Sequence, residues 1–184
     1  MSAQWNILVH FFVFDSLQKD EISLLKNVHP ADNSNRGWKS MTLDCTFKAY
    51  SGKQSMIDRI DELCVAAENA ITKNNVPIIV LSDKKANDKL CAIPSLVAMG
   101  AIHHHLVGKQ LRSKVALFVE CGDAKEVHDF STLLGYGADG VCPYSVFNCI
   151  SKLQYEKNAE MMELSNEQAI QNYISAIGKG LLKV

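Results

Sequence analysis

Glu120, Glu126 and His128 stand close together in the sequence and have the residue types used in general acid-base catalysis. Glu120 ends a predicted strand, and the other two lie on the helix predicted after it. Tyr144 follows the next predicted strand. Active sites of barrel-like folds lie at the carboxyl ends of strands, so a small enzyme could use Glu120, His128 and Tyr144. The sequence offers no matching nucleophile or cofactor loop, which favours a polar network that orients the loops.

Three consecutive histidines, His103, His104 and His105, suggest a metal site by their type. Consecutive residues on a helix point about 100 degrees apart and do not converge on one ion. No Glu, Asp, Cys or His stands three or four residues away to complete a helical ligand pair. The triplet therefore favours a mixture of buried and surface histidines, and no metal ligands are assigned.

Residues 135–140 read GYGADG and satisfy the GxGxxG pattern of dinucleotide-binding loops. That pattern needs a strand before the glycines and a helix after them, so that the helix N-terminus faces the phosphates. Here a predicted helix precedes the glycines and a predicted strand follows, so the helix presents its carbonyl end, which repels anions. We therefore predict a helix-to-strand turn with Gly135 in the left-handed position. No cofactor-binding residue is assigned.

The elements that position these residues alternate between short apolar runs and longer amphipathic segments, which is typical of βα units in a parallel sheet. Strands are predicted at residues 41–50, 76–81, 114–120 and 140–143. Helices are predicted at residues 55–71, 94–109, 124–134, 144–153 and 165–178, with a polar loop at 83–92 and Gly122 and Asp123 as the cap of the third helix. The predicted fold class is α/β, with parallel βα units that form a rudimentary, incomplete TIM-barrel-like domain or an open parallel sheet.

Length and composition limit the classes of function. A chain of 184 residues with 47% hydrophobic and 21% charged residues is typical of one globular domain. The net charge of -1, with Lys and Arg scattered along the chain, argues against nucleic acid as a partner. The apolar run 7–14 is too short for a membrane span and lacks a signal-peptide pattern. Six single cysteines without a CxxC pair predict buried free thiols in an intracellular, reducing compartment.

Residues 93–144 also carry a family resemblance. Three pieces stand in order: IPS followed by GAIHHHL, then LFVECGDAKEVHDF, then LLGYGADGVCPY. In this order and spacing they resemble the central domain of the glutamate synthase large subunit, and the LSD segment at 81–83 matches as well. Residues 41–184 are assigned to this domain. Residues 1–40 form a poorly matched segment with a short helix and a loop, where Val13, Phe14 and Asp15 replace the family's proline-led segment.

The resemblance implies a parent oxidoreductase of ammonia assimilation and glutamate biosynthesis, which transfers the amide nitrogen of glutamine to 2-oxoglutarate with reduction to glutamate. It implies FMN and a 3Fe-4S cluster in the full-length parent. It also implies amidotransferase and FMN domains as partners, joined by a central domain whose role is structural. The electron donor (NADH, NADPH or ferredoxin) and the choice between cytosol and plastid stay open.

The chain lacks the cysteine patterns that carry the chemistry of full-length members of the family. The family's amidotransferase uses an N-terminal cysteine, whereas this sequence begins Met1, Ser2, Ala3. Cys142 and Cys149 stand seven residues apart without a third neighbour, unlike the closely spaced cysteines of an iron-sulfur site. We therefore expect a fragment that is inactive on its own, although whether it is an enzyme stays open. A non-catalytic binding or assembly module, pairing through its edge strands, is the remaining alternative.

Overall fold

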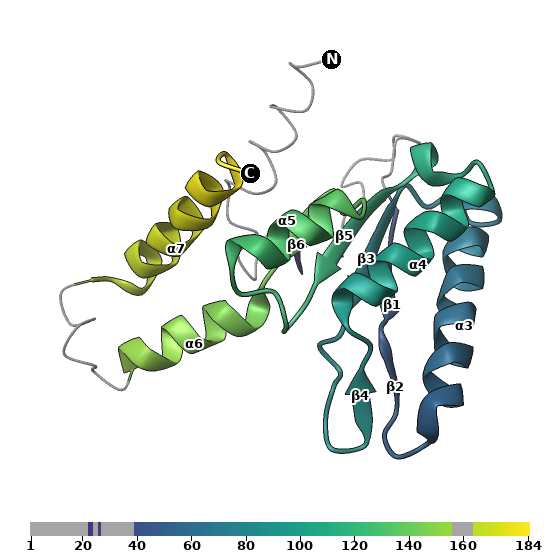
Figure 1. Ribbon diagram of the computed structural model, residues 1–184, viewed down its shortest axis with the longest axis horizontal. Helices are drawn as coiled ribbons and strands as arrows, with labels where there is room; N and C mark the ends of the chain where they lie inside the picture. Colours follow the sequence, from purple (N-terminus) through teal and green to yellow (C-terminus); the bar gives the residue numbers. More distant parts are fainter. Residues whose placement is uncertain (1–21, 24–25, 27–38, 156–163) are drawn as a thin grey trace, which may run out of the picture.

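The computed structural model describes residues 22–23, 26, 39–155 and 164–184 (Figure 1). Ile22, Ser23 and Lys26 are helical, where a short helix is predicted. The other predictions for residues 1–38 lie outside the described residues. The assignment of residues 41–184 to one domain stays a prediction.

A four-stranded parallel sheet forms the centre of the fold. Its strands are β1 (Ser40–Asp44), β3 (Ile78–Ser82), β5 (Ala116–Glu120) and β6 (Gly140–Cys142), hydrogen-bonded in that order. Neighbouring strands run parallel, because a helix carries the chain back after each of the first three strands. The predicted α/β class with a parallel sheet is confirmed. The described strands form an open sheet rather than a closed barrel, so the barrel-like arrangement stays a prediction.

A two-stranded antiparallel sheet, which we call the arm, extends from the carboxyl edge of the main sheet (Figure 1). It pairs β2 (Thr46–Lys48) with β4 (Leu90–Ala92). The prediction of one strand over residues 41–50 is wrong, because the chain leaves the main sheet at Cys45. The Cys45 N–H still donates to the carbonyl of Ser82 at 2.8 Å, but the next residue pairs within the arm. The loop predicted at 83–92 likewise contains β4.

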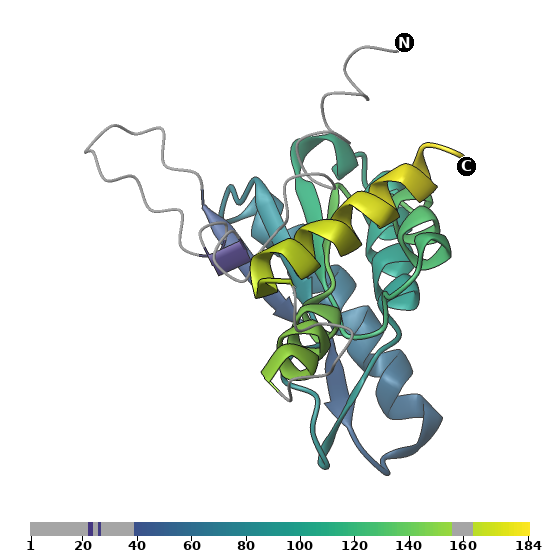
Figure 2. The ribbon, with the colours of Figure 1, turned by 90° about the vertical axis from the view of Figure 1, so that its left-hand side faces the viewer.

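Five described α-helices between residues 52 and 181 pack around the sheet. They are α3 (Gly52–Thr72), α4 (Ser95–Gly108), α5 (Val127–Gly135), α6 (Tyr144–Tyr155) and α7 (Asn166–Leu181), and a single 3-10 turn, η1 (Arg112–Lys114), leads into β5. In Figure 1, α3 and α4 lie on one side of the sheet, and α6 and α7 lie on the other. Figure 2 shows α7 in front with α3 behind it. α7 packs against α5 and α6.

The two faces of the sheet have separate apolar clusters. The face toward α3, α4 and α5 carries the larger one, to which the strands contribute Leu43, Ile79, Leu81, Leu117, Val119 and Val141. The opposite face carries Ile78, Val80 and Phe118, which pack with Phe147 of α6, Ile174 of α7 and Ile22. β3 and β5 are therefore covered on both faces, which explains why their sequences are almost continuously apolar.

The start of α5 differs from the prediction. The helix begins at Val127 instead of residue 124, and the N–H of Glu126 donates to Asp129 Oδ2 at 3.0 Å. Asp123 therefore does not cap α5. Its Oδ2 accepts a hydrogen bond from the N–H of Ser95 at 2.9 Å and satisfies the first amide of α4. The carboxylate caps a different helix from the one that its sequence position suggests.

The end of α5 also differs in detail. The predicted helix-to-strand turn is confirmed, since α5 ends at Gly135 and β6 begins at Gly140. The residue with positive φ is Gly137, at 102°, and not Gly135. Only glycine adopts this conformation without strain.

All six cysteines are free, as predicted. Four are buried: Cys45, Cys64, Cys121 and Cys142. The expectation of burial is wrong for Cys91 on the arm and Cys149 on α6, which are exposed. None of the described helices combines the length and hydropathy needed to cross a membrane.

Candidate functional site at the carboxyl edge of the sheet

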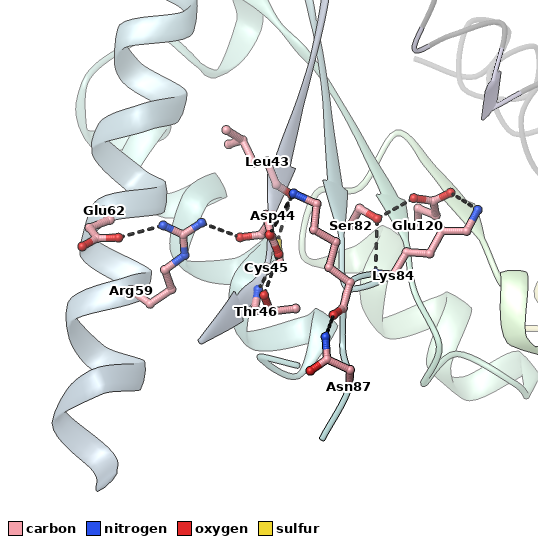
Figure 3. Close-up of polar contacts among 11 residues, drawn as sticks. Leu43, Asp44, Cys45, Thr46, Arg59, Glu62, Ser82, Lys84, Asn87 and Glu120 are labelled. Carbon is pink, nitrogen blue, oxygen red and sulfur yellow. Dashed lines mark hydrogen bonds and ion pairs between the residues drawn. The ribbon is translucent and has the colours of Figure 1, made fainter. Parts of the chain in front are cut away.

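Three polar side chains line up across the carboxyl edge of the main sheet (Figure 3). In the strand register, Asp44 of β1 is paired with Ser82 of β3, and Ser82 is paired with Glu120 of β5. Residues paired in this way project from the same face of a sheet. Glu120 therefore ends its strand as predicted and lies in a row with two other polar groups.

Glu120 is the centre of a group that we call the carboxyl-edge cluster, which consists of Lys26, Ser82, Lys84 and Glu120. The Glu120 side chain is only 1% exposed. Ser82 Oγ donates to Glu120 Oε2 at 2.5 Å, and Lys26 Nζ donates to the same oxygen at 2.6 Å. Lys84 Nζ donates to Oε1 at 3.3 Å. Both carboxylate oxygens therefore have partners within the protein.

The charge state of Glu120 follows from these contacts. Burial by itself would raise the pKa of Glu120 above its ordinary value of 4.5. The hydrogen bonds from Lys26 and Ser82, together with the charges of both lysines, outweigh burial and hold the pKa below that value. Glu120 is therefore ionised at neutral pH and cannot serve as a general acid there.

Asp83 follows β3 and has a different environment. It is 6% exposed, and its Oδ2 accepts a hydrogen bond from the N–H of Gly122 at 2.9 Å. The Tyr144 hydroxyl donates to the same carboxylate, whereas Oδ1 is buried without a partner among the described residues. Burial raises the pKa of Asp83, and burial together with the nearby Asp83 carboxylate raises the pKa of Tyr144.

The space beside Asp83 is very small. Cys45, Ser95, Glu120 and Cys121 are among the residues that line a cavity of about 10 Å³. A cavity of that size holds about one water molecule. Burial raises the pKa of Cys45 to about 12 and raises that of Cys121 as well, so both thiols stay protonated at neutral pH. The cavity has neither the room nor the nucleophile for an organic substrate.

Further hydrogen bonds join the loops that follow β3, β5 and β6. The Asp83 N–H donates to the carbonyl of Glu120 at 3.3 Å, and the Cys121 N–H donates to the carbonyl of Cys142 at 3.0 Å. Ser145 Oγ donates to the carbonyl of Gly122 at 2.7 Å. The polar groups of this edge are thus engaged chiefly with one another. This arrangement fixes the loops in place.

The structure separates the candidate residues that the sequence groups together. Glu120 and Tyr144 both lie at the carboxyl edge, where Lys84 Nζ stands 5.7 Å from the centre of the Tyr144 ring. Glu126 and His128 are exposed at the start of α5. Across the described ranges, neither makes a hydrogen bond or ion pair with Glu120 or Tyr144. A joint catalytic use of Glu120, His128 and Tyr144 stays an untested prediction.

The histidine triplet and the glycine pattern meet at the opposite edge of the sheet, in a group that we call the amino-edge cluster: His103, Arg112, Gly137 and Asp139. Arg112 donates to His103 Nδ1 at 3.1 Å, to Asp139 Oδ2 at 2.7 Å and to the Gly137 carbonyl at 2.6 Å. A Cβ atom on Gly137 would overlap the His103 ring. The glycine pattern therefore serves a packed turn.

The three histidines have different neighbours, as helical spacing predicts. His103 accepts from Arg112, and burial together with the Arg112 charge lowers its pKa. His105 Nε2 lies 2.8 Å from Glu68 Oε2 on α3, and His104 is exposed. Within the part of the chain that the structure describes, no three His, Cys, Asp or Glu side chains are placed to hold a metal ion. Cys142 is buried and Cys149 is exposed.

Asp83, Lys26 and Arg112, which make these contacts at the two edges of the sheet, are not predicted as site residues from the sequence. Asp83 carries a usable signal, because a polar residue directly after a buried strand stands at the carboxyl edge. Lys26 carries none, because it lies 94 residues from its partner Glu120. Arg112 lies in a polar stretch whose composition does not distinguish it from a solvated loop.

Fold and site together define an α/β domain with an open parallel sheet, in which the domain's own side chains enclose Glu120 at the carboxyl edge. The sequence pattern of the glutamate synthase central domain matches residues 11–184, and this chain belongs to that family.

Three relatives illustrate the family. The NADH glutamate synthase of Schizosaccharomyces pombe is 42% identical over 168 residues, which is 91% of this chain and 8% of the relative. The NADPH glutamate synthase large chain of Bacillus subtilis is 36% identical over 91% of this chain and 10% of its own length. The ferredoxin-dependent glutamate synthase of Antithamnion sp. is 36% identical over 78% of this chain and 10% of its own length. The chain therefore spans no more than a tenth of these relatives.

Proposed function

We propose that this chain is the connecting domain of a glutamate synthase. The parent enzyme would transfer the amide nitrogen of glutamine to 2-oxoglutarate, with reduction, to form glutamate. The domain would hold the glutamine-hydrolysing part and the flavin-bearing part in a fixed relation, so that ammonia passes between them without reaching solvent. The family membership and the names of the relatives support this proposal.

The observation that carries the structural role is the enclosure of Glu120 at the carboxyl edge. A catalytic acid or base must face a substrate, and barrel-like enzymes place such groups at this edge. Here Glu120 is 1% exposed and bonded through both oxygens, and the adjacent cavity is about 10 Å³. A rigid domain contributes to a channelled reaction by fixing distances between centres, which needs no reactive group of its own.

We also infer that the open sheet is an incomplete barrel. In a closed barrel, helices cover the outer face of the strands and side chains fill the interior. Here α3, α4 and α5 cover one face, and side chains from α6 and α7 cover the other. The second set of helices would fill the space that further strands enclose in a complete barrel. FMN and the 3Fe-4S cluster would belong to other parts of the parent enzyme.

The proposal is tested by replacing the matching region of the Schizosaccharomyces pombe enzyme with residues 11–184 of this chain. We expect the chimera to form glutamate from glutamine, 2-oxoglutarate and NADH. We also expect it to release little free ammonia. A folded chimera that hydrolyses glutamine but forms no glutamate would refute the connecting role.

A second test uses the 184-residue chain alone. We expect a colourless protein that releases no ammonia from glutamine. A purified protein with a flavin spectrum, or one that hydrolyses glutamine, would show that the domain carries chemistry of its own.

A further inference from the structure

The helix α4 differs from every other described helix in its charge. From Ile93 to Gly108 the sequence contains no Asp, Glu, Lys or Arg, whereas α3, α5, α6 and α7 each contain at least one. A helix that is apolar on all sides is normally enclosed by protein. The sequence of α4 is therefore that of a buried helix.

Three sides of α4 are covered within the domain, apart from Val107, which is 50% exposed. Met99, Ile102 and Leu106 are fully buried in the core. On one flank, His105 contacts Glu68 of α3 at 2.8 Å. On the other flank, the Tyr136 ring lies over Gly100, where an added Cβ would stand 3.1 Å from the ring.

The fourth side of α4 is a strip that we call the α4 stripe: Val97, Ala101, His104 and Gly108. Its spacing of four, three and four residues places these positions on one helical face. Val97 is 44% exposed, His104 and Gly108 are exposed, and Ala101 is half-buried. Tyr136 beside it is 49% exposed. Exposed apolar side chains that lie next to one another are a feature of contact sites.

The outward face of α7 provides a contrast within the same domain. Its exposed positions include Gln168, Gln171, Ser175 and Lys179, which suit direct contact with water. The α4 stripe has no such groups apart from one imidazole. An exposed face without charged groups is therefore not a general property of the helices in this fold.

We propose that the α4 stripe is a contact surface for an apolar, uncharged surface elsewhere in the same glutamate synthase polypeptide. The inference rests on the proposed function. We infer the partner surface from the relatives. The match covers only 8% and 10% of their lengths, so most of each polypeptide lies outside this domain and is available to contact it. The core of a protein interface is depleted in charge, which the stripe satisfies. Ala101 and Gly108 also allow a partner backbone to approach closely.

The experiment compares thiol labelling in the 184-residue chain and in the chimera described above. The two exposed native cysteines of the chain, Cys91 and Cys149, are first replaced by Ser. His104→Cys probes the stripe, and Asp61→Cys, at an exposed position of α3, is the matched control. We expect His104→Cys to react with a maleimide at least about tenfold more slowly in the chimera than in the chain alone, because labelling needs access to the thiol. Asp61→Cys should react at similar rates in both.

The outcomes separate this inference from the proposed function. If the chimera forms glutamate but His104→Cys reacts as fast in it as in the isolated chain, the proposed contact surface is wrong and the proposed function stands. If labelling of His104→Cys in the isolated chain became slower at higher protein concentration, and the chain had the mass of a dimer, the partner would be a second copy. That result would also overturn the proposed contact surface. A chimera that folds but forms no glutamate would refute the proposed function first, and this inference with it.

Discussion

The two polar clusters lie at opposite edges of one sheet and are built differently. The amino-edge cluster is local, since Arg112 and Asp139 stand 27 residues apart and close the turn between α5 and β6. The carboxyl-edge cluster joins distant segments, since Lys26 and Glu120 stand 94 residues apart. In barrel-like enzymes the carboxyl edge carries the chemistry and the amino edge carries stability. Here both edges are bonded internally, which supports the proposal that both serve stability.

Arg112→Ala should have the largest effect. The change leaves the Asp139 carboxylate and the carbonyls of Val115 and Gly137 without their guanidinium donor. We expect the free energy of unfolding to fall by about 3 to 5 kcal/mol, because the half-buried guanidinium gives up three hydrogen bonds that its charge strengthens. Urea unfolding measures the change. As a control, Lys109→Ala, which removes an exposed ion pair with Glu68, should cost less than about 1 kcal/mol.

Glu120→Ala should have the second-largest effect. It removes the acceptor of Ser82 and Lys26 and leaves a cavity. We expect a loss of about 3 kcal/mol. A loss of this size would show that the carboxyl-edge cluster contributes about as much stability as the amino-edge cluster. Glu120→Gln preserves the shape and should cost less. If Glu120→Ala were neutral or stabilising, the carboxyl edge would resemble a strained active site, and the comparison would fail.

The pH dependence distinguishes charge from packing at Glu120. The folded-state pKa of Glu120 lies below its ordinary value of 4.5, so its ionised form contributes stability at neutral pH. That contribution is lost as the pH falls through the folded-state pKa. The difference in unfolding free energy between the unchanged chain and Glu120→Gln should therefore be constant near pH 7 and shrink below pH 4.5. A difference that stays constant to pH 3 would assign the effect to packing.

Gly137→Ala tests the turn of the amino-edge cluster. The backbone φ of 102° strains any side chain, and the added Cβ displaces the His103 ring from Arg112. We expect a cost of about 2 kcal/mol in thermal or urea unfolding. Gly135→Ala is the matched control, because its Cβ meets nothing within 4 Å and it ends α5. It should be neutral or slightly stabilising. Equal losses would contradict the assignment of the turn to Gly137.

Tyr144→Phe should have the smallest effect. It removes one donor to the buried Asp83 carboxylate and leaves the Gly122 N–H in place. We expect a loss of about 1 kcal/mol at neutral pH. The pKa of Asp83 is already raised, and the change raises it further, so the loss should shrink as the pH falls and Asp83 becomes protonated. Chemical unfolding at pH 7 and pH 4 gives the comparison.

The sequence predicts the regular elements better than the contacts between them. Helical spacing and the apolar run of β3 identify the parallel βα units, because long periodic patterns report which face is buried. The sequence does not predict the arm, because its strands of three residues are too short to show a hydrophobic period. Asp123 resembles a cap for α5 in sequence, yet it binds the amide of Ser95 on α4. Such a partner is set by tertiary packing and leaves no local signal.

The structural role of Glu120 is tested most directly by Glu120→Gln in the chimeric glutamate synthase, with stability and turnover measured on the same preparation. We predict a lower unfolding midpoint with an unchanged rate of glutamate formation per folded molecule. A fall of about 100-fold or more in turnover with an unchanged midpoint would assign Glu120 to catalysis and contradict the structural role of the carboxyl edge.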